Sequence, residues 1–210
     1  MTKVKICGMT RLEDALWAET VGADAIGLIF AQTSKRRVDV ATAQTIIQGL
    51  GIFTQTVGVF RNQDIHEVLD IAHLLKLDIV QLHGDENEAY ILKVRESFPV
   101  IKALAVKDKL DNEHLNTLPA DMLLIDSPLP GSGDVFDWSM VKDLSCLGNF
   151  ILAGGLKPDN LLEAIEYFKP YGVDVASGVE SSYGVKDKNK VQDFVSLAKC
   201  GLWTENLSTT

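Results

Sequence analysis

The sequence predicts an α/β protein, a single (β/α)₈ barrel of the TIM type with its active site at the C-terminal ends of the strands. Apolar, strand-like runs alternate with helix-like segments along the chain, which is typical of a parallel sheet. Eight such units fill the 210 residues and leave no sequence for a second domain, which favours a closed barrel over an open, doubly wound sheet. A dinucleotide-binding sheet would carry G-x-G-x-x-G after its first strand, and Cys7-Gly8-Met9-Thr10 lacks that motif.

Each element is predicted from its hydrophobic period and from the turn residues beside it. We expect strands at residues 3–7, 24–30, 56–60, 78–82, 100–106, 121–125, 150–153 and 173–176. We expect helices at residues 11–20, with Thr10 as candidate N-cap, at about 40–50, 64–75, 86–97, 111–118, 138–144 and 187–199, and between the last two strands. Residues 1–200 then form the catalytic barrel domain, and residues 201–210 a frayed tail.

A short repeat supports this count of strands. An aspartate stands at the start of the second, fourth, sixth and eighth apolar runs, within Gly-Ala-Asp at 22–24, Leu-Asp at 77–78, Ala-Asp at 120–121 and Gly-Val-Asp at 172–174. The repeat therefore marks every second strand–helix unit of the predicted barrel.

Composition and charge limit the classes of function. Apolar residues make up 46% of the chain and charged residues 23%, an ordinary balance for a globular domain. The net charge of −9 argues against nucleic acid or an anionic membrane as partner, since both need a basic face. Three widely spaced cysteines indicate neither a disulfide framework nor a zinc site. With no apolar run long enough for a membrane span and no room for a signal peptide before residue 3, we expect a cytoplasmic protein; its oligomeric state is left open, a monomer included.

Two glycine turns near the end of the chain predict a phosphate site. Gly154-Gly155 follows the seventh apolar run, and Ser177-Gly178 follows the eighth. Glycines after buried strands let backbone N–H groups approach a ligand, and the last two strand ends are where many such barrels bind phosphate. A single Gly-Gly pair could equally be a tight turn, so the prediction depends on both turns occurring together.

Several polar residues are expected inside the barrel, because side chains two apart along a strand share a face. The residues so placed are Lys5, Cys7, Gln81, His83, Lys102, Asp126 and Asp174. Buried charges are costly unless they are paired, and we interpret Asp174 and one of the lysines as a structural ion pair. Cys7 and Asp126 differ from these, since they end their strands at the catalytic rim.

Cys7 and Asp126 are candidates for a general base and a general acid. A cysteine in a strand is commonly a small core residue, so Cys7 gains meaning only opposite Asp126 and beside a phosphate site. The thiol would have to become more acidic, and Lys5 or a helix N-terminus could do that. Asp126 would have to keep its proton through partial burial.

Arg36 and His83 are the remaining candidates. A guanidinium grips a carboxylate through two parallel hydrogen bonds, which makes Arg36 the predicted binder of a second anionic group, although a solvated loop charge is an equal alternative. His83 ends its strand before Gly84, where it could orient a substrate or cap the following helix.

Six segments together resemble one family, phosphoribosylanthranilate isomerase of tryptophan biosynthesis. They are KICGMT at 5–10, VGVF at 57–60, QLHGDE at 81–86, FDW at 136–138, LAGGLKPDN at 152–160 and VDVASGVE at 173–180. The resemblance extends to about residue 199. One segment departs from the family pattern: the loop at 127–134 lacks the usual Gly-rich run with a basic residue, which puts in doubt how that loop closes over a substrate.

The resemblance implies a (β/α)₈ barrel that needs neither metal nor organic cofactor and acts on a small phosphosugar. The implied reaction is an Amadori rearrangement of N-(5-phosphoribosyl)anthranilate to the 1-deoxyribulose 5-phosphate ketoamine. By match of motif, Cys7 is the general base, Asp126 the general acid and Arg36 the ligand of the anthranilate carboxylate. The phosphate turns correspond to Gly154, Gly155, Ser177 and Gly178.

Two other readings keep the phosphate turns. An epimerase or the histidine-pathway aldose–ketose isomerase would share the barrel, and the latter would have an aspartate where Cys7 stands. A barrel that only binds a phosphometabolite would have no use for the pair of Cys7 and Asp126.

Overall fold

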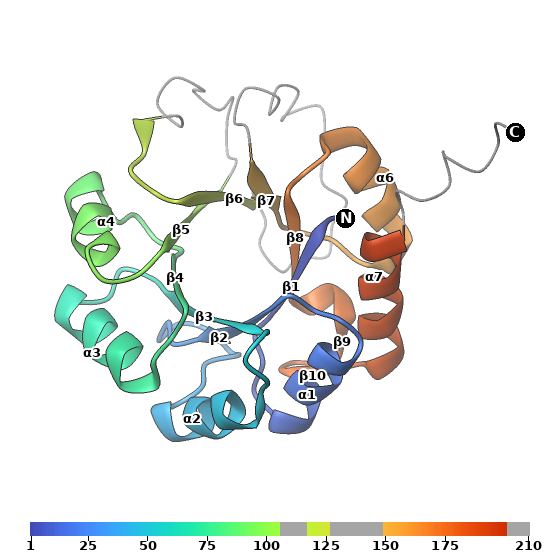
Figure 1. The fold of residues 1–210 in the computed structure, drawn as a ribbon, viewed down its shortest axis with the longest axis horizontal. Coiled ribbons are helices and arrows are strands. Elements are labelled where there is room, and N and C mark those ends of the chain that lie inside the picture. The colour runs from blue at the N-terminus through green and yellow to red at the C-terminus, as the bar shows by residue number, and fades with distance from the viewer. Residues whose placement is uncertain (106–116, 127–148, 201–210) are drawn as a thin grey trace, which may run out of the picture.

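The computed structural model describes residues 1–105, 117–126 and 149–200. Eight parallel strands form a closed barrel in the order β1 to β8, and β8 pairs with β1. The described helices lie on the outer side of this barrel (Figure 1). The predicted fold class is confirmed.

The bounds of the elements follow the sequence pattern closely. The barrel strands are β1 (Lys3–Cys7), β2 (Ala25–Ile29), β3 (Gln55–Phe60), β4 (Ile79–Leu82), β5 (Val100–Ala105), β6 (Met122–Asp126), β7 (Phe150–Leu152) and β8 (Gly172–Val175). The helices are α1 (Leu12–Thr20), α2 (Val40–Gly49), α3 (Ile65–Leu75), α4 (Glu88–Arg95), α6 (Pro158–Phe168) and α7 (Lys188–Cys200). The helices predicted at 111–118 and 138–144, and the tail, fall wholly or mainly outside the described residues.

Short elements follow β8 that the sequence pattern did not indicate. They are the 3-10 helix η3 (Ser177–Val179) and the antiparallel strands β9 (Glu180–Ser182) and β10 (Val185–Lys186). The two strands form a small hairpin between the end of β8 and helix α7.

Polar side chains cap the N-termini of four of the described helices. Asp39, Asp64 and Asn87 accept hydrogen bonds from backbone N–H groups in the first turns of α2, α3 and α4. Asp187 does so at α7, where its Oδ1 accepts from the backbone N–H groups of Asn189 and Lys190.

The prediction that Thr10 caps α1 was wrong. The N-cap of α1 is Arg11 without a side-chain cap, and the Thr10 hydroxyl donates instead to the carbonyl oxygen of Gly184 in the β9–β10 hairpin.

The core has two layers. The larger layer lies between the strands and the helices, with Ile6, Phe60 and Leu82 among its fully buried members. The smaller layer fills the barrel interior and consists of Val57, Ile101, Ala103, Leu124, Ile151 and Ala153. Because Ile101 and Ala103 face the interior, Lys102 faces outward, and its predicted place inside the barrel was wrong. Its ammonium group lies 2.7 Å from the Glu86 carboxylate in a buried ion pair.

Lys5 and Asp174 form the ion pair expected inside the barrel. Lys5 Nζ lies 2.8 Å from Asp174 Oδ1, and both side chains are buried. Burial alone would lower the pKa of Lys5, but the Asp174 carboxylate and, after it, the neighbouring Cys7 together hold that pKa above its ordinary value. The pair joins neighbouring strands β1 and β8, since Lys5 and Asp174 are register partners.

The aspartate repeat has a structural reason. Asp24, Asp78 and Asp121 each accept a hydrogen bond from a backbone N–H group of the preceding strand. The donors are Val4 of β1, Thr56 of β3 and Val100 of β5. Each carboxylate thus satisfies a backbone donor at the N-terminal edge of the barrel, where the ladder leaves it unpaired.

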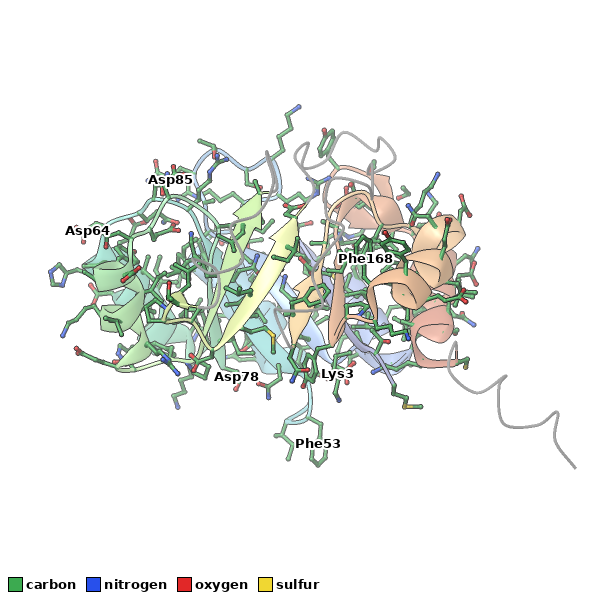
Figure 2. All side chains as sticks on the ribbon, turned by 90° about the horizontal axis from the view of Figure 1, so that it is seen from above. Lys3, Phe53, Asp64, Asp78, Asp85 and Phe168 are labelled. Carbon is green, nitrogen blue, oxygen red and sulfur yellow. The ribbon has the colours of Figure 1, made fainter. Side chains whose placement is uncertain are left out.

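The two faces of the barrel are distinct in Figure 2. Lys3, Asp78 and the protruding Phe53 mark the N-terminal face, and Asp64 and Asp85 mark the opposite face, toward which the strands run. No helix among the described residues is long and apolar enough to cross a membrane.

Candidate active site

A pocket of about 190 Å³ lies at the C-terminal ends of the strands, and all eight predicted site residues line it. These residues are Cys7, Arg36, His83, Asp126, Gly154, Gly155, Ser177 and Gly178. They come from β1, β6 and the segments that follow β2, β4, β7 and β8, so the closed barrel is what brings them together. The roles given to them in the sequence analysis stay predictions.

Cys7 ends β1 and is buried beside the interior ion pair. Burial raises the pKa of the Cys7 thiol above its ordinary value, and the nearby positive charge of Lys5 only partly offsets that effect. Lys5 does lower the pKa of Cys7, as expected, but burial raises that pKa by more, and the thiol does not become more acidic. The sulfur has room because residue 27 is glycine: a Cβ there would lie 2.7 Å from Sγ.

Asp126, His83 and Gln81 form a chain of hydrogen bonds. The ring Nε2 of His83 lies 3.1 Å from Asp126 Oδ2, and the ring Nδ1 lies 3.0 Å from Gln81 Nε2. If the Gln81 amide donates to Nδ1, then Nε2 carries the hydrogen and donates to Asp126. His83 does not cap the next helix, because α4 begins at Glu88 with Asn87 as its N-cap.

The two glycine turns lie side by side. Gly154 and Gly155 both have positive φ, at 83° and 64°, a conformation that glycine adopts without strain. Gly178 packs so closely that an added Cβ would lie 1.9 Å from the carbonyl oxygen of Leu156. Glycine at 178 is therefore required by the packing of one turn on the other, whether or not a ligand is bound.

Arg36 lies in the loop between β2 and α2 and makes two hydrogen bonds to one carboxylate. Its Nε and Nη2 donate to the two oxygens of Glu180, at 2.6 and 2.7 Å. The side chain is only 15% exposed, so the alternative of a solvated loop charge is not supported.

Two residues near this pocket were missed by the sequence analysis. Glu180 and Lys186 both belong to the β9–β10 hairpin and are buried. Lys186 Nζ donates to Glu180 Oε1 at 3.0 Å and to the backbone carbonyl oxygen of Cys7 at 2.7 Å. The only signal for Glu180 was its place two residues after Gly178, and nothing in the sequence pointed to Lys186.

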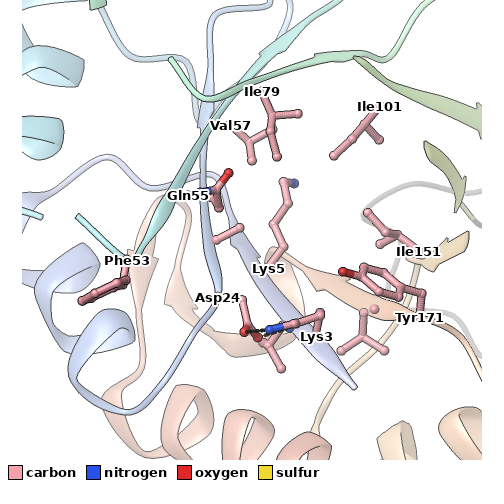
Figure 3. A pocket seen from close by; sticks show the side chains of 14 residues that line it. Lys3, Lys5, Asp24, Phe53, Gln55, Val57, Ile79, Ile101, Ile151 and Tyr171 are labelled. Atoms are coloured by element: carbon pink, nitrogen blue, oxygen red, sulfur yellow. Dashed lines mark hydrogen bonds and ion pairs between the residues drawn. The ribbon is translucent and has the colours of Figure 1, made fainter. Parts of the chain in front are cut away.

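A larger cavity, of about 440 Å³, lies at the N-terminal ends of the strands (Figure 3). Val57, Ile79 and Ile101 line it, the side chain of Lys5 extends among them, and Phe53 lies at its edge. Neither Cys7 nor Asp126 lines this cavity. The predicted base and acid both line the smaller pocket at the opposite end.

Other sequence motifs lie elsewhere. The loop at 127–134 and the FDW segment at 136–138 fall outside the described residues. Within the described ranges, no three His, Cys, Asp or Glu side chains are grouped so that they could hold a metal ion.

The fold and the pocket define the class: this is a (β/α)₈-barrel enzyme with its polar groups at the C-terminal rim. A family model described as N-(5'phosphoribosyl)anthranilate (PRA) isomerase matches residues 4–197. The chain belongs to this family of isomerases, which are intramolecular oxidoreductases.

Individual relatives agree with this assignment. The N-(5'-phosphoribosyl)anthranilate isomerase of Geobacter sulfurreducens is 45% identical over 203 residues, which cover 95% of this chain and 99% of the relative. A solved structure of phosphoribosyl anthranilate isomerase in complex with reduced 1-(o-carboxyphenylamino)-1-deoxyribulose 5-phosphate is 39% identical, with a TM-score of 0.86 over 95% of this chain and 99% of that one.

A third relative bears on oligomeric state. A Thermotoga maritima structure is described as mutually generated monomers of a dimeric phosphoribosylanthranilate isomerase. It is 37% identical, with a TM-score of 0.86 over 95% of this chain and 99% of that one. That description makes the parent enzyme a dimer. The oligomeric state of this chain stays open between a monomer and a larger assembly.

Proposed function

We propose that the chain converts N-(5-phosphoribosyl)anthranilate to 1-(2-carboxyphenylamino)-1-deoxyribulose 5-phosphate, with Cys7 as general base and Asp126 as general acid. The observation that carries the proposal is the single pocket in which a thiol, a carboxyl group, a guanidinium and two glycine turns converge. These groups match the parts of the substrate in turn, since it has a phosphate, a carboxylate and a sugar carbon that must lose a proton.

The first step opens the ribose ring. Asp126 donates a proton to the ring oxygen while the anthranilate nitrogen supplies an electron pair to C1. The C1–O bond breaks, its electrons stay on the oxygen that becomes a hydroxyl group, and a protonated Schiff base forms between C1 and nitrogen. His83, 3.1 Å from the Asp126 carboxyl, holds that group in place as it loses its proton.

The second step moves the double bond. The Cys7 thiolate removes the proton from C2, the C–H electrons form the C1=C2 bond, and the C1=N electrons return to nitrogen. The resulting enolamine relaxes to the ketone without a further catalyst. Neither step needs an electron from outside, because C1 is reduced as C2 is oxidised.

Binding residues hold the two ends of the substrate. The turns at Gly154-Gly155 and Ser177-Gly178 offer backbone N–H groups to the phosphate, as expected for the last two strand ends of such a barrel. Arg36 would bind the carboxylate through the part of its guanidinium that Glu180 leaves free. We further expect this biosynthetic enzyme to act in the cytoplasm, given its unpaired cysteine pattern.

The alternatives are less well supported. A histidine-pathway isomerase would be expected to have an aspartate at position 7. A barrel that only binds its ligand would not need an acid and a base at the C-terminal ends of two strands in one pocket.

A direct assay tests the proposal. The purified protein is mixed with freshly made phosphoribosylanthranilate, and the loss of substrate fluorescence is followed against buffer alone. We expect a loss that scales with protein concentration and that inorganic phosphate inhibits. A rate equal to that in buffer would overturn the proposal.

A further inference from the structure

The β9–β10 hairpin contributes a buried pair of opposite charges to the edge of the pocket. Glu180 and Lys186 are register partners in the hairpin, and Lys186 Nζ lies 3.0 Å from Glu180 Oε1. Neither residue is among those to which the proposed reaction gives a part. Each nevertheless contacts a residue that has one.

Glu180 fixes the orientation of Arg36. A guanidinium has a side edge, formed by Nε and one Nη, and an end formed by its two Nη groups. Glu180 accepts from Nε and Nη2 of Arg36, and so it takes the side edge. Within the described residues, Nη1 has no hydrogen-bond partner, so the end keeps two parallel donors for a second carboxylate.

Neighbouring residues restrict Arg36 further. Gly8, with φ +72°, lets the arginine side chain cross the backbone, since a Cβ on Gly8 would lie 2.7 Å from Arg36 Cδ. The Tyr183 ring lies 4.8 Å from the guanidinium carbon. Arg36 is therefore held by contacts on several sides before any substrate arrives, which reduces the entropy lost on binding.

Lys186 keeps the charge of this group positive. Arg36 and Glu180 alone would cancel, and a neutral pair attracts an incoming carboxylate only weakly. Burial lowers the pKa of the Lys186 ammonium group, and the Glu180 carboxylate 3.0 Å away offsets part of that effect. With Lys186 protonated, the charges of Arg36, Glu180 and Lys186 sum to +1, and the cluster can accept one more negative charge. Burial alone would raise the pKa of the Glu180 carboxyl, but the hydrogen bonds from Arg36 and the charge of Lys186 hold it below its ordinary value, so Glu180 stays ionised near neutral pH.

Lys186 also reaches the catalytic strand. Its ammonium group donates to the backbone carbonyl oxygens of Cys7, at 2.7 Å, and of Ala176, at 3.0 Å. These two residues stand at and just past the ends of β1 and β8, so one side chain joins both strand ends to the hairpin.

We propose that Glu180 and Lys186 are positioning residues for the isomerase reaction: Glu180 directs the free end of Arg36 toward the substrate carboxylate, and Lys186 balances Glu180 and holds the end of β1 that carries Cys7. This inference rests on the proposed function and assigns two residues to it that bind no part of the substrate themselves.

A double-mutant cycle between Arg36 and Glu180 tests the proposal. The variants are Arg36→Met, Glu180→Gln, which keeps the shape of the side chain, and the two together. We expect Glu180→Gln to raise KM about tenfold with kcat within about threefold of wild type, as for lost binding. In the Arg36→Met background the same change should raise KM less than about twofold, because the residue through which it acts is gone.

Two controls separate positioning from general damage. Glu163→Gln, on the exposed face of α6, should leave both constants unchanged. The inhibition constant of inorganic phosphate should stay the same in Glu180→Gln, since the glycine turns do not involve it. Equal effects of Glu180→Gln with and without Arg36, or a weaker inhibition by phosphate, would show a merely structural role and overturn the proposal.

The variant Lys186→Met tests the proposed role of Lys186 independently of the Arg36–Glu180 cycle. Removing a positive charge close to Cys7 should lower kcat and move the alkaline limb of the kcat/KM profile to higher pH, because the thiolate loses stabilisation. An unchanged kcat with an unchanged profile would remove Lys186 from the proposal.

The proposed function can fail separately. If the wild-type protein does not turn over phosphoribosylanthranilate, the same cycle is measured by calorimetry as the Kd of the reduced 1-(o-carboxyphenylamino)-1-deoxyribulose 5-phosphate. Coupling between Arg36 and Glu180 in that Kd would support positioning, and its absence, or a lack of binding, would overturn it.

Discussion

His83 Nε2 lies 3.1 Å from Asp126 Oδ2, so the ring that follows β4 contacts the carboxyl group that ends β6. This contact makes His83 a partner of the proposed acid. A hydrogen bond to a charged group contributes about 1.5–3 kcal/mol, and losing it should slow the proton transfer.

We therefore expect His83→Ala to lower kcat by about tenfold or somewhat more. His83→Gln should recover part of the rate, since its amide can also donate to a carboxylate. Steady-state kinetics of the two variants check this, and equal rates for both would show that the hydrogen bond to Asp126 has no part in turnover.

Substitutions of the proposed acid and base should change kcat, whereas substitution of the proposed carboxylate ligand should change KM. Cys7→Ser and Asp126→Asn should each lower kcat by about 10²–10⁴-fold with little effect on KM, because they act only on the way to the transition state. Arg36→Met should mainly raise KM, because it removes binding that the ground and transition states share. Near-normal turnover of Cys7→Ser, in an assay limited by chemistry, would return Cys7 to the role of a core cysteine.

The pH dependence follows from the proton states that the two groups need. The reaction needs the acid protonated and the base ionised. Between the two pKa values, a rise in pH lowers the fraction of protonated acid by the same factor by which it raises the fraction of ionised base. Burial raises the pKa of Cys7, and kcat/KM should therefore stay level through neutral pH and fall only above the ordinary cysteine value of about 8.5. A fall that begins near pH 7 would contradict this assignment.

Gly155 offers a sharper test of the phosphate site than Gly178, at which any side chain would meet the Leu156 carbonyl. Gly155→Ala should raise the inhibition constant of inorganic phosphate, because the positive φ of the turn no longer suits residue 155. Gly22→Ala is the matched control: it has φ +99° and lies far from the pocket, at the end of α1. It should cost stability without changing phosphate inhibition, and equal phosphate effects in both variants would argue against the site.

The ion pair between Lys102 and Glu86 should matter for stability. Burial alone would raise the pKa of Glu86, and Lys102 is the main group that holds it below its ordinary value. Lys102→Met leaves a buried charge unpaired, which should cost about 3–5 kcal/mol of unfolding free energy. Urea unfolding measures this loss, and Lys102→Met with Glu86→Gln should recover much of it.

An exposed pair provides the comparison. Lys93 and Glu96 form an ion pair on the surface, and Lys93→Met should change the unfolding free energy by less than about 1 kcal/mol. A similar small loss for Lys102→Met would show that water already screens the buried pair.

The barrel and most of the pocket could be predicted from the sequence, because both depend on the residue pattern within each strand and directly after it. Seven of the eight apolar runs end at or just before a polar or glycine residue, and parallel strands bring the strand ends to one rim. Cys7 and Asp126 could be placed at that rim from strand position alone.

Other features depend on contacts that the local pattern does not contain. The face of Lys102 was mistaken because β5 is buried on both sides, so its hydrophobic pattern does not distinguish interior from exterior. Glu180 is 144 positions away from Arg36 in the chain, and only the closed barrel brings them together. Thr10 had a good capping residue type but bonded to a distant loop.

The carboxylates of Asp24, Asp78 and Asp121 each join an odd strand to the even strand that follows it. These joins divide strands β1 to β6 into three two-strand modules, and the seam between β8 and β1 is joined by a buried ion pair, Lys5 with Asp174. A circular permutant opened between modules, in the α2–β3 connection, keeps every such join within a continuous stretch of chain. One opened between β1 and β2 separates Val4 from Asp24 and must re-form that join across new termini.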